Sequence, residues 1–139
     1  MKTLLSTKRA LALMAFTLLS VMSYAQSASV MVTNTTDCYY IVEVRAKSPN
    51  NCANACTTGQ VCIPPNSVTP ISPCGGTKLE WAGAGITPAD PNCRACSNLG
   101  ITIARFCYNF PIKDGGAHCD SKCRSYIAEF TSPTDIRIY

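Results

Sequence analysis

The stretch Cys38-Tyr39-Tyr40-Ile41-Val42-Glu43-Val44-Arg45-Ala46-Lys47 decides the fold. Its side chains alternate in character with a period of two, which is the repeat of a β-strand. One face carries Cys38, Tyr40, Val42, Val44 and Ala46, and the other carries Tyr39, Ile41, Glu43, Arg45 and Lys47. Because the first set is mostly apolar, we expect it to face a hydrophobic core.

Similar short runs continue on both sides of this strand, and residues typical of turns separate them. The runs are 29–33, Gln60–Ile63, Ser67–Ile71, Thr77–Ala82, Leu99–Phe110, Arg124–Thr131 and Asp135–Tyr139. The expected turns are Pro64-Pro65-Asn66, Gly83-Ala84-Gly85, Asp114-Gly115-Gly116 and Ser132-Pro133-Thr134, and the expected surface loops are Asn50–Gly59 and Ile86–Asn98. Without long amphipathic helices, this pattern predicts an all-β, antiparallel two-sheet β-sandwich of about eight short strands, with a small closed barrel as the alternative.

The first residues have the organisation of a secretory signal peptide. A basic start with Lys2, Lys8 and Arg9 precedes the apolar run Ala10–Met22 and the small-residue cleavage pattern Ser23-Tyr24-Ala25. Roughly 13 apolar residues are too few for a membrane-spanning helix, which needs about 20. We therefore predict a signal peptide over residues 1–25, a single domain over 26–139, and a secreted protein that is extracellular or periplasmic.

Removal of the signal changes the charge of the chain. The full sequence has 12 Lys and Arg against 8 Asp and Glu, and three of the basic residues lie in the signal. The mature chain is therefore close to neutral, at about +1. A nucleic acid or an anionic membrane is not expected as a partner, because binding to phosphates needs a basic surface.

The mature part contains all ten cysteines of the chain. They are Cys38, Cys52, Cys56, Cys62, Cys74, Cys93, Cys96, Cys107, Cys119 and Cys123. An even number in an exported chain predicts a disulfide framework, in which each bridge contributes about 2 to 4 kcal/mol. Spacing alone leaves the pairing open, and a bridge between Cys38 and Cys107 is our guess because both fall in strand-like runs.

Four of these cysteines could instead bind zinc, and two of the four could form a redox-active pair. Cys93-x-x-Cys96 and Cys119-x-x-x-Cys123 have a spacing that zinc accepts, and Cys93-x-x-Cys96 alone resembles a redox pair. Against zinc stand the export signal and the six other cysteines. Against a redox pair stands its expected position in a loop after Asp90-Pro91-Asn92. We therefore expect no metal and no cofactor.

Catalytic signals are sparse. His118 is the only histidine, so every serine–histidine or cysteine–histidine mechanism would need it, and we expect an exposed loop residue without a role. Two carboxylates could hydrolyse a glycoside without histidine, but the sequence does not bring any two together. The candidates are Glu43, Glu80, Asp90, Asp114, Asp120 and Glu129. An enzyme is the less favoured interpretation.

The aromatic side chains support a binding function somewhat better than the residues above support catalysis. Tyr39, Trp81 and Tyr108 are candidate binding residues, because flat rings stack on sugars and anchor protein partners. Ile41 is the fourth candidate, because it lies next to Tyr39 on the same face of its strand. Tyr39 and Ile41 would form an exposed or partner-covered strip if Tyr40 points inward. A place in the hydrophobic core is the competing interpretation for Trp81.

Self-assembly by strand exchange is a third possibility. The segment Gln26–Asn34 follows the predicted cleavage site, and a free N-terminal strand can extend a neighbour's sheet. The run Asp135–Tyr139 likewise places a strand near the other end of the chain. Ordinary strands within one domain explain both segments equally well.

A resemblance to known proteins rests on three stretches: Val32–Tyr40, Pro73-Cys74-Gly75-Gly76 and Leu79-Glu80-Trp81. They resemble uncharacterised small secreted cysteine-rich β proteins of Bacteroidetes-type bacteria. Only the first stretch is also similar to thaumatin-like proteins, which are much longer and have an acidic cleft. Neither resemblance implies a role for a particular residue.

The sequence as a whole favours a secreted, non-catalytic binding or surface-structural module. Its partner would be a glycan, a protein or further copies of the chain. The alternatives are a secreted inhibitor or toxin-like effector, and a small carboxylate-dependent hydrolase.

Overall fold

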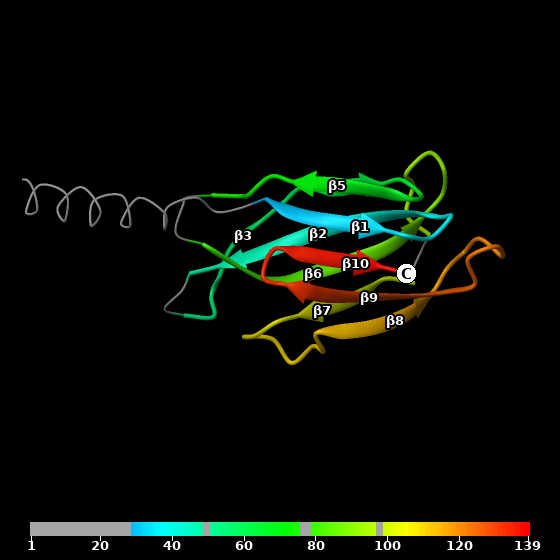
Figure 1. The fold of residues 1–139 in the computed structure, drawn as a ribbon. Coiled ribbons are helices and arrows are strands. Elements are labelled where there is room, and N and C mark those ends of the chain that lie inside the picture. Colours follow the sequence, from blue (N-terminus) through cyan, green and yellow to red (C-terminus); the bar gives the residue numbers. More distant parts are fainter. Residues whose placement is uncertain (1–28, 49–50, 76–78, 97–98) are drawn as a thin grey trace, which may run out of the picture.

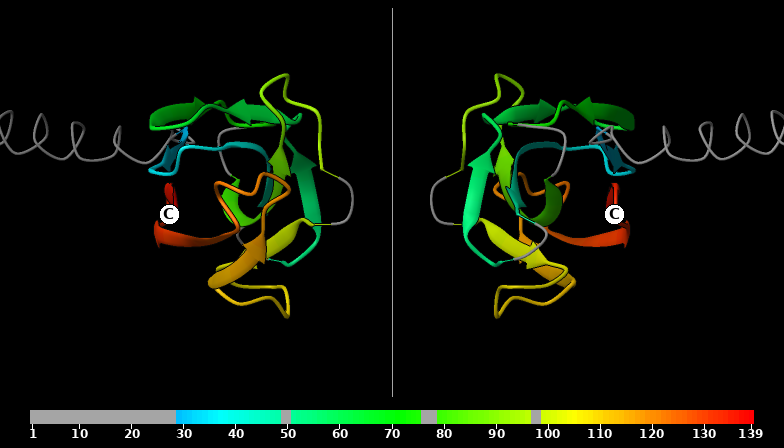
Figure 2. Two further views of the ribbon diagram at one scale, coloured as in Figure 1. Left: turned by 90° about the vertical axis from the view of Figure 1, so that its right-hand side faces the viewer. Right: turned by 90° about the vertical axis from the view of Figure 1, so that its left-hand side faces the viewer.

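The computed structural model describes residues 29–48, 51–75, 79–96 and 99–139, and within them it contains ten strands (Figure 1). They are β1 (Val30–Asn34), β2 (Tyr39–Lys47), β3 (Asn54–Thr57), β4 (Val61–Ile63), β5 (Ser67–Ile71), β6 (Glu80–Ala89), β7 (Ile101–Ala104), β8 (Lys113–Ala117), β9 (Ser125–Ser132) and β10 (Asp135–Ile138). Two five-stranded sheets pack against each other (Figure 2). The predicted all-β sandwich is confirmed, with ten strands rather than about eight. The predicted signal peptide lies outside the described residues.

The strand order shows how the two sheets are built. The first sheet has the order β5-β1-β10-β9-β8, and the second has the order β3-β2-β6-β7, with β4 also paired to β2. β1 and β10 are parallel, with Val32 opposite Ile136, so the expectation of purely antiparallel sheets is wrong for this pair. Parallel neighbours need a long connection, and most of the domain lies between these two strands. The sheets also approach each other where β7 lies next to β8 and β4 lies next to β5.

The hydrophobic core lies between the sheets and follows the alternation of β2. Cys38, Tyr40, Val42, Val44 and Ala46 are all buried, as the sequence predicts. Opposite them, the first sheet contributes Val30, Val32, Tyr126, Ala128, Phe130, Ile136 and Ile138. Each large apolar side chain buried in this way contributes about 1.5 to 3 kcal/mol.

Two glycine-rich stretches that we expect to be turns lie inside strands instead. Gly83-Ala84-Gly85 is in the middle of β6, and Asp114-Gly115-Gly116 is in β8. A Cβ atom on Gly83 would lie 3.1 Å from the carbonyl oxygen of Ile103, and one on Gly116 would lie 2.8 Å from the Tyr126 ring. These two glycines therefore serve close packing, which the sequence does not distinguish from a turn.

The expected loops and one expected strand also differ from the structure. β6 continues to Ala89, so the first residues of the expected loop Ile86–Asn98 are strand, and β3 lies within the expected loop Asn50–Gly59. The expected strand Leu99–Phe110 is regular only over β7. After it the chain turns, with Cys107 at a φ of 70°. In the described ranges, no helix is long and apolar enough to cross a membrane.

All ten cysteines form disulfides. The five bonds are Cys38–Cys123, Cys52–Cys107, Cys56–Cys74, Cys62–Cys93 and Cys96–Cys119. The guessed Cys38–Cys107 bond is wrong, because Cys107 lies in the irregular segment after β7 rather than in a strand. The zinc and redox interpretations fail as well, since Cys93 and Cys96 bond to different partners.

Candidate ligand-binding site

A buried histidine, His118, connects Tyr39 at the start of β2 with the turn that follows β8. His118 follows β8 and is 8% exposed, which corrects the expectation of an exposed loop residue. The backbone N–H of Asp120 donates to its Nδ1 at 2.9 Å, so Nδ1 carries no proton. Nε2 therefore carries the proton and donates it to the carbonyl oxygen of Tyr39 at 3.1 Å. Both ring nitrogens are occupied by structural hydrogen bonds.

Two tyrosine rings support His118 from the core. The Tyr40 ring lies edge-on to the imidazole at a centroid distance of 5.2 Å and is 4.9 Å from the Tyr126 ring. The Tyr126 hydroxyl is 3.3 Å from the carbonyl oxygens of Ile86 and Leu99. Burial raises the pKa of both tyrosine hydroxyls above the ordinary value of 10.0, because it disfavours the charged phenolate.

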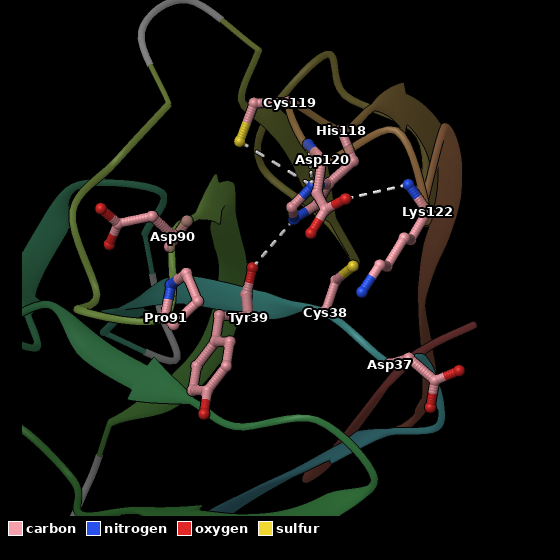
Figure 3. A pocket seen from close by; sticks show the side chains of 10 residues that line it. Asp37, Cys38, Tyr39, Asp90, Pro91, His118, Cys119, Asp120 and Lys122 are labelled. Atoms are coloured by element: carbon pink, nitrogen blue, oxygen red, sulfur yellow. Dashed lines mark hydrogen bonds between the residues drawn. The ribbon is translucent and has the colours of Figure 1, made fainter.

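A cavity of about 420 Å³, which we call the Tyr39 pocket, opens beside His118 (Figure 3). Three segments form it: the start of β2, the end of β6 with the loop that follows, and the turn between β8 and β9. The lining residues are Asp37, Cys38, Tyr39, Ala89, Asp90, Pro91, His118, Cys119, Asp120 and Lys122. Its size lies within the range of small-molecule sites.

The walls of the Tyr39 pocket combine an apolar side with charged groups. The half-buried Tyr39 ring and Pro91 form the apolar side, and Asp120 and Lys122 come from the turn across from them (Figure 3). Asp37 and Asp90 add two further carboxylates. With one lysine against three aspartates, the lining favours ligands that donate hydrogen bonds.

Two of the three carboxylates of the pocket, Asp90 and Asp120, are held in place by their own loops. Asp90 Oδ1 accepts the backbone N–H groups of Asn92 at 2.9 Å and Arg94 at 2.8 Å. Asp120 Oδ1 accepts the N–H of Lys122 at 2.9 Å. A carboxylate has about four acceptor positions, so each retains capacity for a ligand after these bonds.

Disulfides make this site rigid. Cys38–Cys123 and Cys96–Cys119 tie the turn after β8 to the start of β2 and to the loop after β6. The pocket is thus preorganised, which lowers the entropic cost of binding.

The four predicted binding residues lie in four different environments. Tyr39 lines the Tyr39 pocket, whereas Trp81 is 5% exposed and belongs to the core. Ile41 is not exposed: it is paired in register with Cys62, whose disulfide to Cys93 crosses the same face. Tyr108 is half-buried, and its Cδ2 lies 3.5 Å from the position of a Cβ on Gly83.

Among the six candidate carboxylates, Asp90 and Asp120 lie together in the Tyr39 pocket. Glu80 and Glu129 instead pair with lysines, at 3.5 Å in both cases. Sequence reasoning did not identify Asp37, Pro91 or Lys122. Their only signal was a position beside cysteines and turn residues.

Comparisons with known proteins identify no relative of this chain, so its function must be inferred from the fold and the site. No family model, curated protein or solved structure matches this chain. The chain is a small cysteine-rich all-β protein with five disulfides. Such a disulfide content is typical of an oxidising, extracytoplasmic environment.

Proposed function

We propose that this protein is a secreted, non-catalytic binding module that holds a neutral glycan in the Tyr39 pocket. The observation that carries the proposal is the meeting of the Tyr39 ring and Pro91 with three carboxylates and Lys122 in one cavity. A sugar ring presents an apolar face that stacks on an aromatic ring, and its hydroxyls donate hydrogen bonds to carboxylates. The lining offers both kinds of contact.

Secretion is part of the proposal. The predicted signal peptide over residues 1–25 and the five disulfides support it together, because such bonds persist where thiols are not kept reduced. The resemblance to small secreted proteins of Bacteroidetes-type bacteria points to the same extracellular or periplasmic location.

Catalysis is less well supported than binding. A histidine that acts as a base must have a nitrogen ready to take a proton, and Nδ1 of His118 already accepts the Asp120 N–H. A hydrolase that uses Asp90 and Asp120 is the remaining enzymatic alternative, and the experiment below includes it.

Strand exchange is also less well supported. β1 is hydrogen-bonded to β5 on one side and to β10 on the other, and β10 lies between β1 and β9. Donation of either strand to a neighbour would require both of its ladders to break.

Retardation in native gels that contain hydroxyethyl cellulose, mannan or laminarin tests the proposal. We expect retardation by at least one of these neutral polysaccharides, and binding about tenfold weaker in Tyr39→Ala. Tyr139→Ala is the matched control, because Tyr139 is an exposed tyrosine that follows β10 in the other sheet.

Three outcomes would overturn the proposal. The first is no retardation by any of the polysaccharides, and the second is equal weakening in Tyr39→Ala and Tyr139→Ala. The third is release of reducing ends that disappears in Asp90→Asn or Asp120→Asn, which would establish the hydrolase instead.

A further inference from the structure

Two glycines on the outer face of β6 have different structural explanations. A Cβ on Gly83 would lie 3.1 Å from the Ile103 carbonyl oxygen, so packing demands glycine there. A Cβ on Gly85 would meet no atom within 4 Å, and its φ is outside the left-handed region. Glycine in the middle of a strand costs about 0.5–1 kcal/mol relative to alanine. Neither packing nor backbone conformation therefore accounts for Gly85.

The space over Gly85 is a groove on the outer face of the second sheet. Gly85 is paired with Glu43 of β2 on one side and with Thr102 of β7 on the other, so these side chains flank it on the same face. The groove has a volume of about 280 Å³ and is lined by Ile41, Glu43, Arg45, Gln60, Gly85, Thr87, Gly100, Ile101 and Thr102. We call it the Gly85 groove.

Both neighbouring parts of this face are covered by other segments. Tyr108 packs over Gly83, two residues along β6 from Gly85. In the other direction, the Cys62–Cys93 disulfide lies beside Ile41, which is buried. The groove is thus an opening of limited size with defined ends.

Polar groups that both donate and accept hydrogen bonds surround the groove. Arg45 Nη2 lies 3.7 Å from Glu43 Oε1, and the two side chains are 39% and 33% exposed. Because these charges offset each other, the groove favours neither an anion nor a cation. The Gln60 amide and the hydroxyls of Thr87 and Thr102 add further donors and acceptors.

We propose that the Gly85 groove is a second binding site, which takes one residue of a neutral, hydroxyl-rich ligand such as a sugar. A ligand that approaches the β6 backbone closely explains why the strand has no side chain at this position. Vicinal hydroxyls match a lining that presents Glu43 and Arg45 side by side. The inference rests on the groove alone and stands even if the Tyr39 pocket binds nothing.

Nuclear magnetic resonance of the mature protein with isotopically labelled glycine tests the inference directly. The probes are cellohexaose and mannohexaose as neutral ligands, with a heparin hexasaccharide as the anionic comparison. At millimolar concentrations we expect at least one neutral probe to shift the amide signals of Gly85 and Gly100. The signals of Gly115 and Gly116, in β8 of the other sheet, should stay in place.

Variants separate the groove from the rest of the surface. A Cβ at position 85 would meet no atom within 4 Å, so Gly85→Val should extend into the groove and abolish the Gly100 shift. Ser125→Val, on an exposed position of β9, should leave the shift unchanged. Thr87→Val and Thr102→Val should each weaken binding about fivefold, because each removes a hydroxyl while retaining the shape of the side chain.

The inference is overturned if neither neutral probe shifts Gly85 and Gly100, if the Gly100 shift survives in Gly85→Val, or if only the heparin probe binds. The Tyr39→Ala variant distinguishes the proposal for the Tyr39 pocket from the proposal for the Gly85 groove. Loss of polysaccharide retardation in Tyr39→Ala with intact Gly85 shifts leaves the Gly85 groove as an independent site. Retardation that depends on Tyr39, without any shift at Gly85, supports the Tyr39 pocket and refutes the Gly85 groove.

Discussion

His118 donates a hydrogen bond from Nε2 to the carbonyl oxygen of Tyr39, a residue 79 positions earlier in the chain. The bond connects the turn after β8 in one sheet to the first residue of β2 in the other. Because Tyr39 also lines the pocket, the same contact that joins the sheets fixes the backbone of the proposed sugar-stacking residue.

Replacement of His118 should destabilise the protein, because the role of this residue is structural. His118→Ala removes two hydrogen bonds and the contact with the Tyr40 ring, and we expect a loss of about 3 kcal/mol in the free energy of unfolding. Urea denaturation with the disulfides intact measures it. His118→Asn, which retains an acceptor for the Asp120 N–H, should lose less. An unchanged midpoint in His118→Ala would contradict the structural role.

Alkaline pH should destabilise the fold through its buried tyrosines. The pKa of Tyr40 and of Tyr126 is raised in the folded state, whereas in the unfolded chain both groups titrate near 10.0. Their contribution to stability is therefore fully present below about pH 10, and it falls at higher pH as the unfolded chain loses these protons first. Denaturation midpoints between about pH 8 and pH 11 measure the effect. Above pH 10 the denaturation midpoint should fall less steeply with pH in Tyr126→Phe than in the wild type. An equally steep fall in both proteins would refute the role of Tyr126 in this pH dependence.

The glycines of β6 and β8 should respond to substitution with opposite signs. Gly85→Ala fills open space in a strand and should stabilise the protein by about 0.5–1 kcal/mol. Gly116→Ala would place a Cβ 2.8 Å from the Tyr126 ring and should destabilise it by about 2 kcal/mol. Thermal unfolding of each variant, compared with the wild type, measures the sign of each change in stability. Stabilisation by Gly116→Ala would show that the Tyr126 ring is not packed as described.

The disulfides should differ in their effect on stability according to the length of chain that each closes. Cys38–Cys123 spans 85 residues and Cys56–Cys74 spans 18. In the chain-entropy description, the longer loop makes the first bond worth about 1.4 kcal/mol more. Paired replacements by alanine, compared by urea denaturation, test this order. Cys38 is also buried, so its replacement should widen the difference further.

Much of the fold was predictable from the alternation of a few strands. The inward set of β2, from Cys38 to Ala46, is buried as predicted, because a strand in a sandwich must place alternate residues in the core. Glycine was the main source of error. Gly83, Gly85 and Gly116 suggested turns, although strands also use glycine where a neighbouring backbone, as at Gly83, or a ring, as at Gly116, leaves no room for a Cβ.

The candidate site was less predictable than the fold. Tyr39 was identified because its neighbour Tyr40 had to point inward, but Asp37, Asp90 and Asp120 come together only through the disulfide pairing and the sheet order. The sequence leaves that pairing open. The role of His118 was missed for the same reason, since its partner Tyr39 is brought to it by the packing of the two sheets.

The parallel pairing of β1 with β10 also determines the order in which the domain can be completed. Thr35 and Ile138, which are hydrogen-bonded, lie 103 positions apart, so this contact can form only after residues 35–138 have all been made. Until then β1 and β9 each have an unpaired edge that can join another chain. Protection of both edges from aggregation during biogenesis thus depends on the docking of β10.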